Sequence, residues 1–509
     1  MVSRCARSLW IGFLLVWSVA AQQAPSYNQP FRPQYHFSPR QNWTNDPNGL
    51  VYFDGEYHLF YQYNPFGDRW GHMSWGHAVS VDLLHWQELP VALPEENGIM
   101  IFTGSTVVDR RNTSGFCGGK ACLVAIYTGH TPGTPTLETQ NIAYSTDRGR
   151  TWTKYSGNPV LNLNLSNFRD PHVFWSDAAS RWVMVVALPN DHKVLIYHSA
   201  DLKKWDRVSE FGPAGATGGQ WECPTLTEVP VEGGQKRWML KVGLNPGALQ
   251  GGSGEQYFIG SFDGTRFTNE NPAVTTLWTD YGKDCYCALP FNGPPPGKRP
   301  VMLGWMSNWQ YAGNVPTEPW RGQMTIPRML QLKKTAAGLR LAQEPVDLLP
   351  LRGAHFGWRG TDVAELNRGL SWESRGGSWE LRATVAPGGA KEIGWKLLSG
   401  EGKYTLVGYN AERGEFFVDR TNSGETGFQR DFPVRTEVKL PAAGATLDFT
   451  ILVDRSTVEV FAQGGLVAMT NLVYPLPRAA NIQFYSEGGK PGRIRLDIWE
   501  LASTWPRSQ

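Results

Sequence analysis

Excess charge of one sign is absent from this sequence. Its 509 residues include 48 Lys and Arg against 46 Asp and Glu, with no long run of either sign. Nucleic acids and anionic membranes are bound through clusters of positive charge, so we expect neither as a partner. A neutral partner is expected instead. The 22 tryptophans are many for this length, and flat aromatic rings suit the apolar C–H faces of sugars, although most of them could lie in the core.

Long apolar runs are also scarce. The chain has a single one, from Leu9 to Val19, which follows Arg4 and Arg7 and precedes small residues ending at Ala21. This layout predicts a cleavable secretory signal over residues 1–21. A membrane anchor is the alternative, but the run is short against the roughly 20 residues that span a bilayer. We therefore expect a secreted protein, extracellular or periplasmic, whose oligomeric state is left open.

Histidine clusters at metal-ligand spacing are missing near the cysteines, so we expect neither a zinc site nor another cofactor. Five of the six cysteines follow the predicted signal, an odd number that leaves at least one thiol free or paired elsewhere. Cys117 and Cys122 flank a Gly-Gly turn and are placed to close a small disulfide loop in an oxidising compartment. The sequence does not determine how these two, Cys285 and Cys287 pair.

Amphipathic helical patterns longer than two turns are hard to find after the signal, which argues against a helical protein. Short alternating runs recur instead between Gly, Pro and Asn clusters, for example Val51 to Tyr63 and Arg181 to Leu188. This texture predicts an all-β fold. A chain of 509 residues exceeds what one hydrophobic core usually organises, so we expect two domains.

A degenerate unit repeats through the first half of the chain: a strand, then Ser-x-Asp, then an aromatic residue a few positions later. Its spacing of roughly 55 to 65 residues suits a four-stranded sheet, and radial repetition of such sheets makes a propeller. Four copies, with room for a fifth near Trp305, predict a five-bladed β-propeller over residues 30–330. Coincident hairpin turns are the alternative, since Asp favours turns. The copies are Ser80, Asp82 and Trp86; Ser145, Asp147 and Trp152; Ser199, Asp201 and Trp205; and Ser261, Asp263 and Phe267.

After about Arg328 the strand candidates become shorter and less aromatic. Residues 331–355 are predicted to be a linker. Residues 356–509 are predicted to form a β-sandwich, because short strands alternate there with turns. The strand candidates are Trp379 to Val385, Tyr404 to Tyr409, Leu447 to Val453 and Thr457 to Phe461.

Two carboxyl groups roughly 5 to 5.5 Å apart, one ionised and one protonated, are needed to break a glycosidic bond with retention. Asp46 lies in the tight turn from Asn42 to Gly49, where the amides of Asn45 and Asn48 are placed to keep its carboxylate ionised. An ionised, fixed carboxylate suits a nucleophile.

Two further acids occupy unusual settings. Glu222 lies between Trp221 and Cys223, surroundings that we expect to be apolar enough to keep its carboxyl group protonated. Asp170 lies in the segment from Phe168 to Pro171, where it follows an arginine and where the proline favours an extended backbone. Each acid also has a plain structural interpretation, as part of an ordinary turn, a structural ion pair or an exposed surface. Their joint occurrence favours a catalytic site.

These three segments resemble the signature blocks of glycoside hydrolase family 32, the β-fructofuranosidases, and the resemblance covers the chain from about Tyr35 to its C-terminal end. It implies a five-bladed propeller followed by a β-sandwich. It also implies a secreted retaining hydrolase that releases terminal β-D-fructofuranosyl units from fructans such as inulin and levan, with sucrose as a lesser substrate. Further blocks in the family's order are Phe60 to Pro65, Trp70 to Trp86, Ile101 to Ser105, Asp280 to Tyr286, Leu303 to Trp309, Pro319 to Arg328 and Asp454 to Phe461.

The resemblance implies a role for each matching residue. Asp46 corresponds to the nucleophile, Glu222 to the general acid/base, and Asp170 to a third carboxylate that holds fructose hydroxyls and stabilises the transition state. Aromatic walls and hydrogen-bonding groups around a furanose fit this role. The positions that would line the fructose pocket are Asn45, Gln62, Trp70, Phe102, Thr103, Arg169, Asp280 and Trp309.

Four residues depart from the family pattern. Thr44 stands where a larger apolar residue is usual, and Thr103 replaces a common serine but keeps its hydroxyl. Cys285 and Cys287 occupy positions usually held by other residue types, and the sequence offers no physical account of them. None of the four removes a carboxylate, so activity is still expected.

Other activities share parts of this pattern. Endo-acting fructanases and fructosyltransferases are alternatives with the same fold, and transfer differs from hydrolysis only in what intercepts the covalent intermediate. The segment Ser145 to Trp152 matches an Asp-box of sialidases, but those enzymes use a tyrosine nucleophile and three arginines. A non-catalytic sugar-binding propeller would have no need of three carboxylates. Release of fructose from chain ends is the expected activity.

Overall fold

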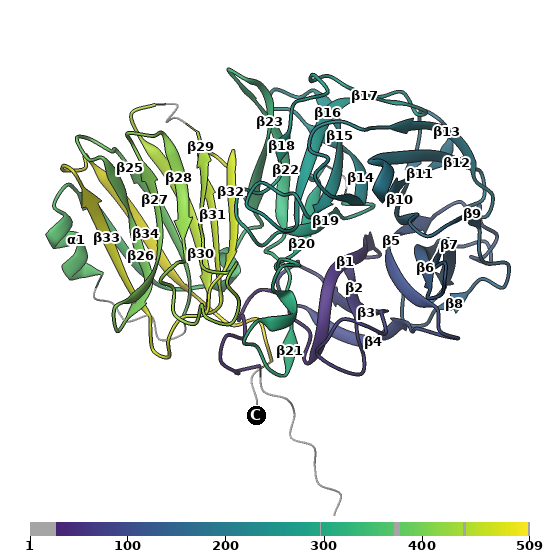
Figure 1. The fold of residues 1–509 in the computed structure, drawn as a ribbon, viewed down its shortest axis with the longest axis horizontal. Helices are drawn as coiled ribbons and strands as arrows, with labels where there is room; N and C mark the ends of the chain where they lie inside the picture. Colours follow the sequence, from purple (N-terminus) through teal and green to yellow (C-terminus); the bar gives the residue numbers. More distant parts are fainter. Residues whose placement is uncertain (1–26, 296, 371–376, 441–443, 507–509) are drawn as a thin grey trace, which may run out of the picture.

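The computed structural model describes residues 27–295, 297–370, 377–440 and 444–506 (Figure 1). The signal predicted over residues 1–21 lies outside this range. Strands dominate the described residues, which contain one α-helix, α1 (Val363–Gly369), and three short 3-10 helices, η1 (Pro189–Asp191), η2 (Ala312–Asn314) and η3 (Leu349–Leu351). The all-β prediction is therefore confirmed. Within the described residues no helix has the length and apolar character to cross a membrane.

The described residues up to Pro345 form five sheets of four or five strands, each built from strands that follow one another in the chain, except that β21 joins the first. The first sheet holds β1 (Asn42–Phe53), β2 (Glu56–Tyr63), β3 (Ser74–Ser80), β4 (Gln87–Leu93) and β21 (Trp320–Arg321). The second holds β5 (Met100–Asp109), β6 (Cys122–Thr131), β7 (Leu137–Ser145), β8 (Thr153–Lys154) and β9 (Leu161–Leu165). The third holds β10 (Arg169–Ser176), β11 (Arg181–Leu188), β12 (Lys193–Ser199) and β13 (Asp206–Phe211). The fourth holds β14 (Gln220–Pro230), β15 (Lys236–Asn245), β16 (Gly254–Phe262), β17 (Phe267–Asn269) and β18 (Leu277–Trp278). The fifth holds β19 (Tyr286–Pro290), β20 (Val301–Trp305), β22 (Arg328–Thr335) and β23 (Gly338–Pro345).

The repeated Ser-x-Asp unit falls at one place in four of these sheets, the turn between the third and fourth strands. Ser80 Oγ donates to Asp82 Oδ1 at 3.0 Å in the first sheet, and Ser145 donates to Asp147 at 2.7 Å in the second. The aromatic residue that ends each unit directly precedes or begins the fourth strand. The side-chain hydrogen bond and the Asp turn fix the chain reversal locally, which explains why the unit recurs.

Neighbouring sheets pack through shared hydrophobic clusters, and β11 shows how the sequence achieves this. Trp182 and Met184 pack toward the second sheet, whereas the alternate residues Val183 and Val185 pack toward the fourth. Because both faces of the strand are buried, its sequence is continuously apolar instead of alternating with polar residues. Similar clusters join the first sheet to the second and the fourth to the fifth.

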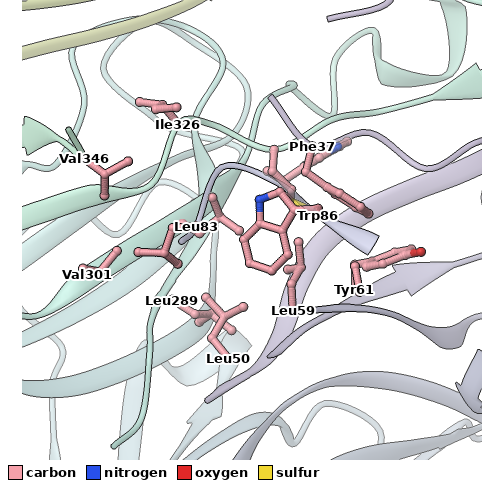
Figure 2. Close-up of a cluster of buried hydrophobic side chains, with 14 of the residues drawn as sticks. Phe37, Leu50, Leu59, Tyr61, Leu83, Trp86, Leu289, Val301, Ile326 and Val346 are labelled. Atoms are coloured by element: carbon pink, nitrogen blue, oxygen red, sulfur yellow. The ribbon is translucent and has the colours of Figure 1, made fainter. Parts of the chain in front are cut away.

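The largest cluster closes the arrangement by joining the fifth sheet to the first (Figure 2). Leu59 and Trp86 from the first sheet region meet Leu289 and Val301 from the fifth in this cluster. The late strand β21 also pairs with β1 in parallel. The five sheets thus follow one another around a closed ring, which lies on the right of Figure 1.

The residues after Arg352 form two sheets that pack face to face. The first runs in the order β24 (Arg352–Gly360), β34 (Ile494–Leu501), β25 (Ser378–Val385), β30 (Leu447–Asp454), β31 (Thr457–Ala462) and β32 (Val467–Leu472). The second runs in the order β29 (Arg435–Lys439), β28 (Glu415–Asp419), β27 (Lys403–Asn410), β26 (Glu392–Gly400) and β33 (Asn481–Glu487). One hydrophobic cluster lies between them, in which the ring of Trp395 meets that of Phe449 edge-on at 4.9 Å.

The linker predicted over residues 331–355 is wrong for most of its length. Residues 328–335 and 338–345 are the strands β22 and β23, which complete the fifth sheet. The side chains of β22 alternate between buried and half-buried positions, but the charged pair Lys333 and Lys334 obscures this pattern in the sequence. Only a short connection around η3 separates the fifth sheet from β24.

A buried ionic network joins the two parts of the chain. His36, close to the start of the first part, is fully buried and contacts Asp454 Oδ2 at 2.9 Å and Glu459 Oε2 at 2.7 Å. Glu459 also forms an ion pair with Arg328, the first residue of β22. Burial alone would lower the pKa of His36, but the hydrogen bonds to the two carboxylates outweigh it and raise the pKa to about 9.

This raised pKa predicts a pH-dependent stability. A histidine whose pKa is 6.5 unfolded and about 9 folded contributes about 3 kcal/mol below pH 6.5, and this contribution disappears as the pH rises to 9. Scanning calorimetry of His36→Gln should therefore show a lower apparent melting temperature at pH 6 and a difference from wild type that vanishes near pH 9. His72→Gln, whose side chain is 60% exposed, is the control. An equal destabilisation of His36→Gln at both pH values would contradict the prediction.

Candidate active site

A β-bulge interrupts the first long strand of each of the five sheets. In each of β1, β5, β10, β14 and β19 the pairing register shifts by an extra residue near the start of the strand, between Thr44 and Pro47, Ile101 and Gly104, Arg169 and His172, Glu222 and Thr225, and Tyr286 and Leu289. These strands contact one another in a closed order around the ring. A β-bulge changes the direction in which nearby side chains point. Five bulges at matching positions of neighbouring strands therefore bring side chains together at one place.

The gathered side chains line a cavity of about 270 Å³. It contains every predicted site residue except Asp280, together with Asn245, which the sequence did not indicate. Asn245 ends β15 just before a proline, a setting typical of a turn. The lining residues are Asn45, Asp46, Gln62, Trp70, Phe102, Thr103, Arg169, Asp170, Glu222, Asn245 and Trp309.

One oxygen of the Asp46 carboxyl group accepts a hydrogen bond, and the other accepts none from the described residues. Thr103 Oγ1 donates to Asp46 Oδ2 at 3.0 Å, and the neighbouring Asn45 side chain lies close enough to lower the pKa of the carboxyl group. Asp46 Oδ1 is buried and has no hydrogen-bond partner among the described residues. An oxygen that is fixed in place but not engaged is available to attack a bound electrophile.

The predicted ionisation of Asp46 is not what the structure favours. Burial first, and then the negative charge of Glu222, raise the pKa of Asp46 from 3.8 to about 7. The hydrogen bonds from Asn45 and Thr103 act in the expected direction but are outweighed. Asp46 therefore takes up a proton more readily than an exposed carboxyl group would.

Glu222 lies in polar surroundings, contrary to the apolar environment expected from Trp221 and Cys223. Arg169 donates to Glu222 Oε1 from Nη2 at 2.8 Å and from Nε at 3.1 Å, and the buried Tyr286 hydroxyl donates to Oε2. Trp221 points away into the cluster between the third and fourth sheets. Tyr286 was part of a recognised sequence block, but nothing in the sequence distinguished it as a partner of Glu222.

Arg169 belongs to a wider hydrogen-bonded group. Its guanidinium also contacts Glu138 Oε2 at 3.3 Å and donates to Gln220 Oε1 at 2.9 Å. The fork of a guanidinium can satisfy several acceptors at once, so Arg169 is fixed in orientation while it faces the pocket. It brings positive charge to a cavity that otherwise concentrates carboxyl groups.

Asp170 sits on the bulge of β10 with a left-handed backbone, φ +66°. The extended conformation expected before Pro171 is therefore wrong, because the bulge imposes its own geometry on the residue. The Cys223 backbone N–H donates to Asp170 Oδ2 at 2.9 Å. Burial raises the pKa of Asp170 well above its ordinary value; the Arg169 charge opposes this shift, and the charges of Glu222 and Asp46 reinforce it.

Asp280, predicted to line the pocket, lies instead between the two parts of the chain. Its Oδ2 accepts from Arg328 Nη1 at 2.8 Å and from Thr470 Oγ1 at 2.6 Å, and its Oδ1 accepts from the Thr470 backbone at 2.8 Å. These contacts use both oxygens of a buried carboxylate. The carboxylate therefore has a structural role, and the family resemblance could not separate that role from substrate binding.

Two disulfides occur among the described residues. Cys117 pairs with Cys122, as their spacing indicated, and Cys223 pairs with Cys287. Cys285 is a buried free thiol. Asp46, Cys223 and Cys287 lie close enough together to suggest a metal site, but sulfurs joined in a disulfide are not the thiolates that bind metals.

Aromatic rings form the walls of the cavity. Trp309 stacks on Trp43 with ring centroids 6.0 Å apart, and Trp70 remains 47% exposed at the rim. Phe102 stacks on His130 at 4.2 Å. Flat apolar rings beside hydroxyl-binding carboxylates, amides and a guanidinium suit a sugar ring.

Paired carboxyl groups in a pocket lined by aromatic rings are the arrangement by which glycoside hydrolases cleave glycosidic bonds. Residues 36–345 match the family model of the glycosyl hydrolases family 32 N-terminal domain, and residues 351–500 match that of the glycosyl hydrolases family 32 C terminal. The chain belongs to glycosyl hydrolases family 32 and is a glycoside hydrolase.

Several characterised proteins are similar over nearly the whole chain. The levanase of Bacillus subtilis (strain 168) is 46% identical over 96% of this chain and 73% of its own length. The extracellular exo-inulinase of Aspergillus awamori is 41% identical over 94% of this chain and 96% of its own length. A crystal structure of the Aspergillus awamori exo-inulinase superposes with a TM-score of 0.87 at 39% identity and covers 94% of this chain and 100% of that one.

The position of Asp280 predicts a stability effect instead of a binding effect. Asp280→Ala removes one partner from the buried Arg328, which typically costs about 3 to 5 kcal/mol. We expect a clearly lower melting temperature and a KM within about twofold of wild type, because Asp280 does not line the pocket. Trp309→Ala is the matched comparison, since that side chain forms a wall and its loss should raise KM. A large rise in KM for Asp280→Ala at unchanged melting temperature would restore the substrate-binding assignment.

Proposed function

We propose that this protein is a secreted, retaining β-fructofuranosidase that releases terminal fructosyl units from fructans such as inulin and levan, and from sucrose. The observation that carries the proposal is the pocket in which Asp46, with one free oxygen, faces Glu222 with its arginine and tyrosine partners. The similarity to a levanase and an exo-inulinase supports the choice of substrate. The extracellular location named for the exo-inulinase and the signal predicted over residues 1–21 support secretion.

We further propose that the five sheets are the blades of a five-bladed β-propeller and that the two C-terminal sheets form a β-sandwich. The closed sequence of hydrophobic clusters and the contacts among β1, β5, β10, β14 and β19 support the first assignment. The shared cluster between the C-terminal sheets supports the second. The boundary then falls near residues 346–350, not at 331–355.

The reaction follows double displacement. The free oxygen of Asp46 attacks the anomeric carbon while Glu222 gives its proton to the departing oxygen, and water then enters with Glu222 acting as base. Once Glu222 has lost its proton, Arg169 and Tyr286 stabilise the carboxylate by hydrogen bonds that are already in place. Such preorganised donors favour the charge that develops in the transition state. This mechanism requires the Asp46 and Glu222 carboxyl groups to lie roughly 5 to 5.5 Å apart.

Asp170 and Arg169 form hydrogen bonds with the hydroxyl groups of the sugar. Asp170 is fixed by the Cys223 N–H through one oxygen, and its other oxygen is left to accept from the substrate. Hydrogen bonds of this kind strengthen as the ring gains oxocarbenium character, so they contribute more to the transition state than to the ground state. Asp170 itself forms no covalent bond in this scheme.

The shape of the surface supports action at chain ends. The pocket has room for little more than one sugar, at about 270 Å³, which suits a terminal unit. At its edge Asn245 also lines a second, polar hollow that contains Asn190, His192 and Gln220. The amides and backbone groups there offer hydrogen bonds to a second unit of a chain, which favours fructans over sucrose.

Product analysis tests the proposed activity. Chromatography of digests of inulin, levan and sucrose should show fructose from the earliest time points. At those early times no short oligosaccharides should be present. Early oligosaccharides would indicate endo action, and products longer than the substrate would indicate fructosyl transfer. Absence of fructose from all three substrates would overturn the proposed function.

Variants of the two carboxyl groups test the mechanism. Asp46→Ala should lower turnover at least about 10⁴-fold, because no covalent intermediate can form. Glu222→Gln should lower turnover of inulin about 10² to 10⁴-fold, yet retain reaction of β-D-fructofuranosyl fluoride with azide, where neither an acid nor a base is needed. The exposed Glu401→Gln on the turn between β26 and β27 is the control.

Glu222→Gln also tests the electrostatic coupling between the Asp46 and Glu222 carboxyl groups. Since the charge of Glu222 is one cause of the raised pKa of Asp46, its removal should lower that pKa. The acid limb of the fluoride reaction should therefore move to lower pH in Glu222→Gln than in wild type. An unmoved limb would mean that the two groups do not share charge.

A further inference from the structure

The bulges of β14 and β19 are joined twice beside Glu222, a residue that lines the pocket. Cys223 and Cys287, each one residue after Glu222 and Tyr286, form a disulfide. The Tyr286 hydroxyl donates to Glu222 in the same place. A covalent link and a hydrogen bond thus connect the same two turns, and the covalent one limits how far the turns can separate.

Cys223 also contacts the other two carboxyl groups of the pocket. Its backbone N–H donates to Asp170 Oδ2 at 2.9 Å, and its sulfur lies 3.9 Å from Asp46 Oδ2. Cys223 and Cys287 both have left-handed backbones, with φ +47° and +45°. A shift of the Cys223 turn would therefore reach all three acids at once.

The chemical state of the Cys223 sulfur decides what it offers to Asp46. In a disulfide the sulfur carries no hydrogen, so it occupies space beside Asp46 Oδ2 without donating to it. A free Cys223 thiol at the same position would be a weak donor. A donor to a carboxylate favours its ionised form, in competition with burial and the charge of Glu222.

We propose that Cys287 is a positioning residue for the reaction: by pairing with Cys223 it fixes the turns that present Glu222 and Tyr286, and it prevents Cys223 from donating a hydrogen bond to Asp46. This inference rests on the proposed hydrolysis. It assigns a role to a cysteine that the sequence left without an explanation.

The inference predicts a measurable difference in pH dependence because reduction of the disulfide adds a thiol hydrogen beside Asp46. Loss of the disulfide removes none of the other groups that face this carboxyl group from the neighbouring strands, and a variant that frees the same turns without a thiol at Cys223 accounts for any movement of Glu222. Those groups are Asn45 on β1, Thr103 on β5, Arg169 and Asp170 on β10, Glu222 on β14, Glu255 on β16 and Tyr286 on β19.

Two variants separate the two effects of the disulfide. Cys287→Ala frees the turns and leaves Cys223 as a thiol, so we expect kcat to fall roughly tenfold through misplacement of Glu222 and the acid limb of kcat/KM to move to lower pH. Cys223→Ala combined with Cys287→Ala frees the turns without providing a thiol. The double variant should show the fall in kcat with an acid limb as in wild type.

The second disulfide of the chain supplies the matched control. Cys117→Ala combined with Cys122→Ala removes a disulfide whose members pack between the second and third sheets, and it should keep the wild-type kcat and pH profile. Reduction of wild type by a small dithiol gives an independent route: the S–S bond accepts two electrons and two protons, two thiols form, and the dithiol becomes a disulfide. The treated enzyme should behave like Cys287→Ala.

The outcomes are distinct. Wild-type kcat and pH profile in Cys287→Ala would overturn the inference, as would a fall in kcat with the same acid limb in both cysteine variants, which indicates a purely structural disulfide. If Cys287→Ala does not fold, the dithiol-treated wild type decides by the same criteria. Failure of wild type to release fructose would overturn the proposed function instead.

Discussion

Asp46, Asp170 and Glu222 share one cavity of about 270 Å³, and the cost of holding three carboxyl groups so close together governs the rest of the site. Burial and mutual repulsion raise the pKa of Asp46 to about 7 and that of Asp170 well above its ordinary value. Arg169 offsets part of this cost by pairing with Glu222. Ionisation of Asp46 and Asp170 together is therefore unfavourable near neutral pH.

The fold brings these groups together by repeating one local device. A regular strand in a ring of sheets would direct its side chains toward the neighbouring sheets, as β11 does. A bulge near the start of β1, β5, β10, β14 and β19 breaks the alternation and turns residues toward the centre. The local sequence of four of the five bulges contains a Pro or a Gly, which suits an irregular backbone. In the fifth, on β19, Cys287 takes a left-handed backbone.

How far the sequence predicts the molecule can be judged from particular residues. The Ser-x-Asp unit located the turns of four sheets, because local hydrogen bonds fix each of them: Ser to Asp in three turns, and backbone N–H groups to Asp263 in the fourth. The fifth sheet lacks this unit, and the sequence predicts a linker in place of its outer strands β22 and β23 because the strand candidates there become shorter and less aromatic. Local signals reveal local structure, whereas membership of a sheet depends on partners far along the chain.

The same distinction holds within the pocket. Asp46, Asp170 and Glu222 were recognisable because each lies in a distinctive short segment. Their ionisation was not, since it depends on neighbours contributed by other sheets: Glu222 proved to be bound by Arg169 and Tyr286, not surrounded by apolar groups. Asp280 shows the reverse case, in which a conspicuous segment serves the contact between the two parts of the chain.

The contact between the two parts of the chain is linked to the pocket by the segment from Asp280 to Tyr286. The backbone N–H groups of Lys283 and Asp284 donate to the Thr470 carbonyl on β32, and Asp284 is also bound by the buried Arg420. A Cβ at Gly282 would come within 2.2 Å of the Thr470 carbonyl oxygen, so only glycine permits this close approach.

Two residues beyond Asp284 the chain reaches Tyr286, the partner of Glu222. The segment from Asp280 to Tyr286 is therefore anchored at one end to the C-terminal sheets and at the other to Glu222, the proposed acid/base residue. The C-terminal sheets therefore bind the segment that carries Tyr286, and Tyr286 in turn contacts Glu222. Only a few residues of one segment separate the contact between the two parts of the chain from the pocket.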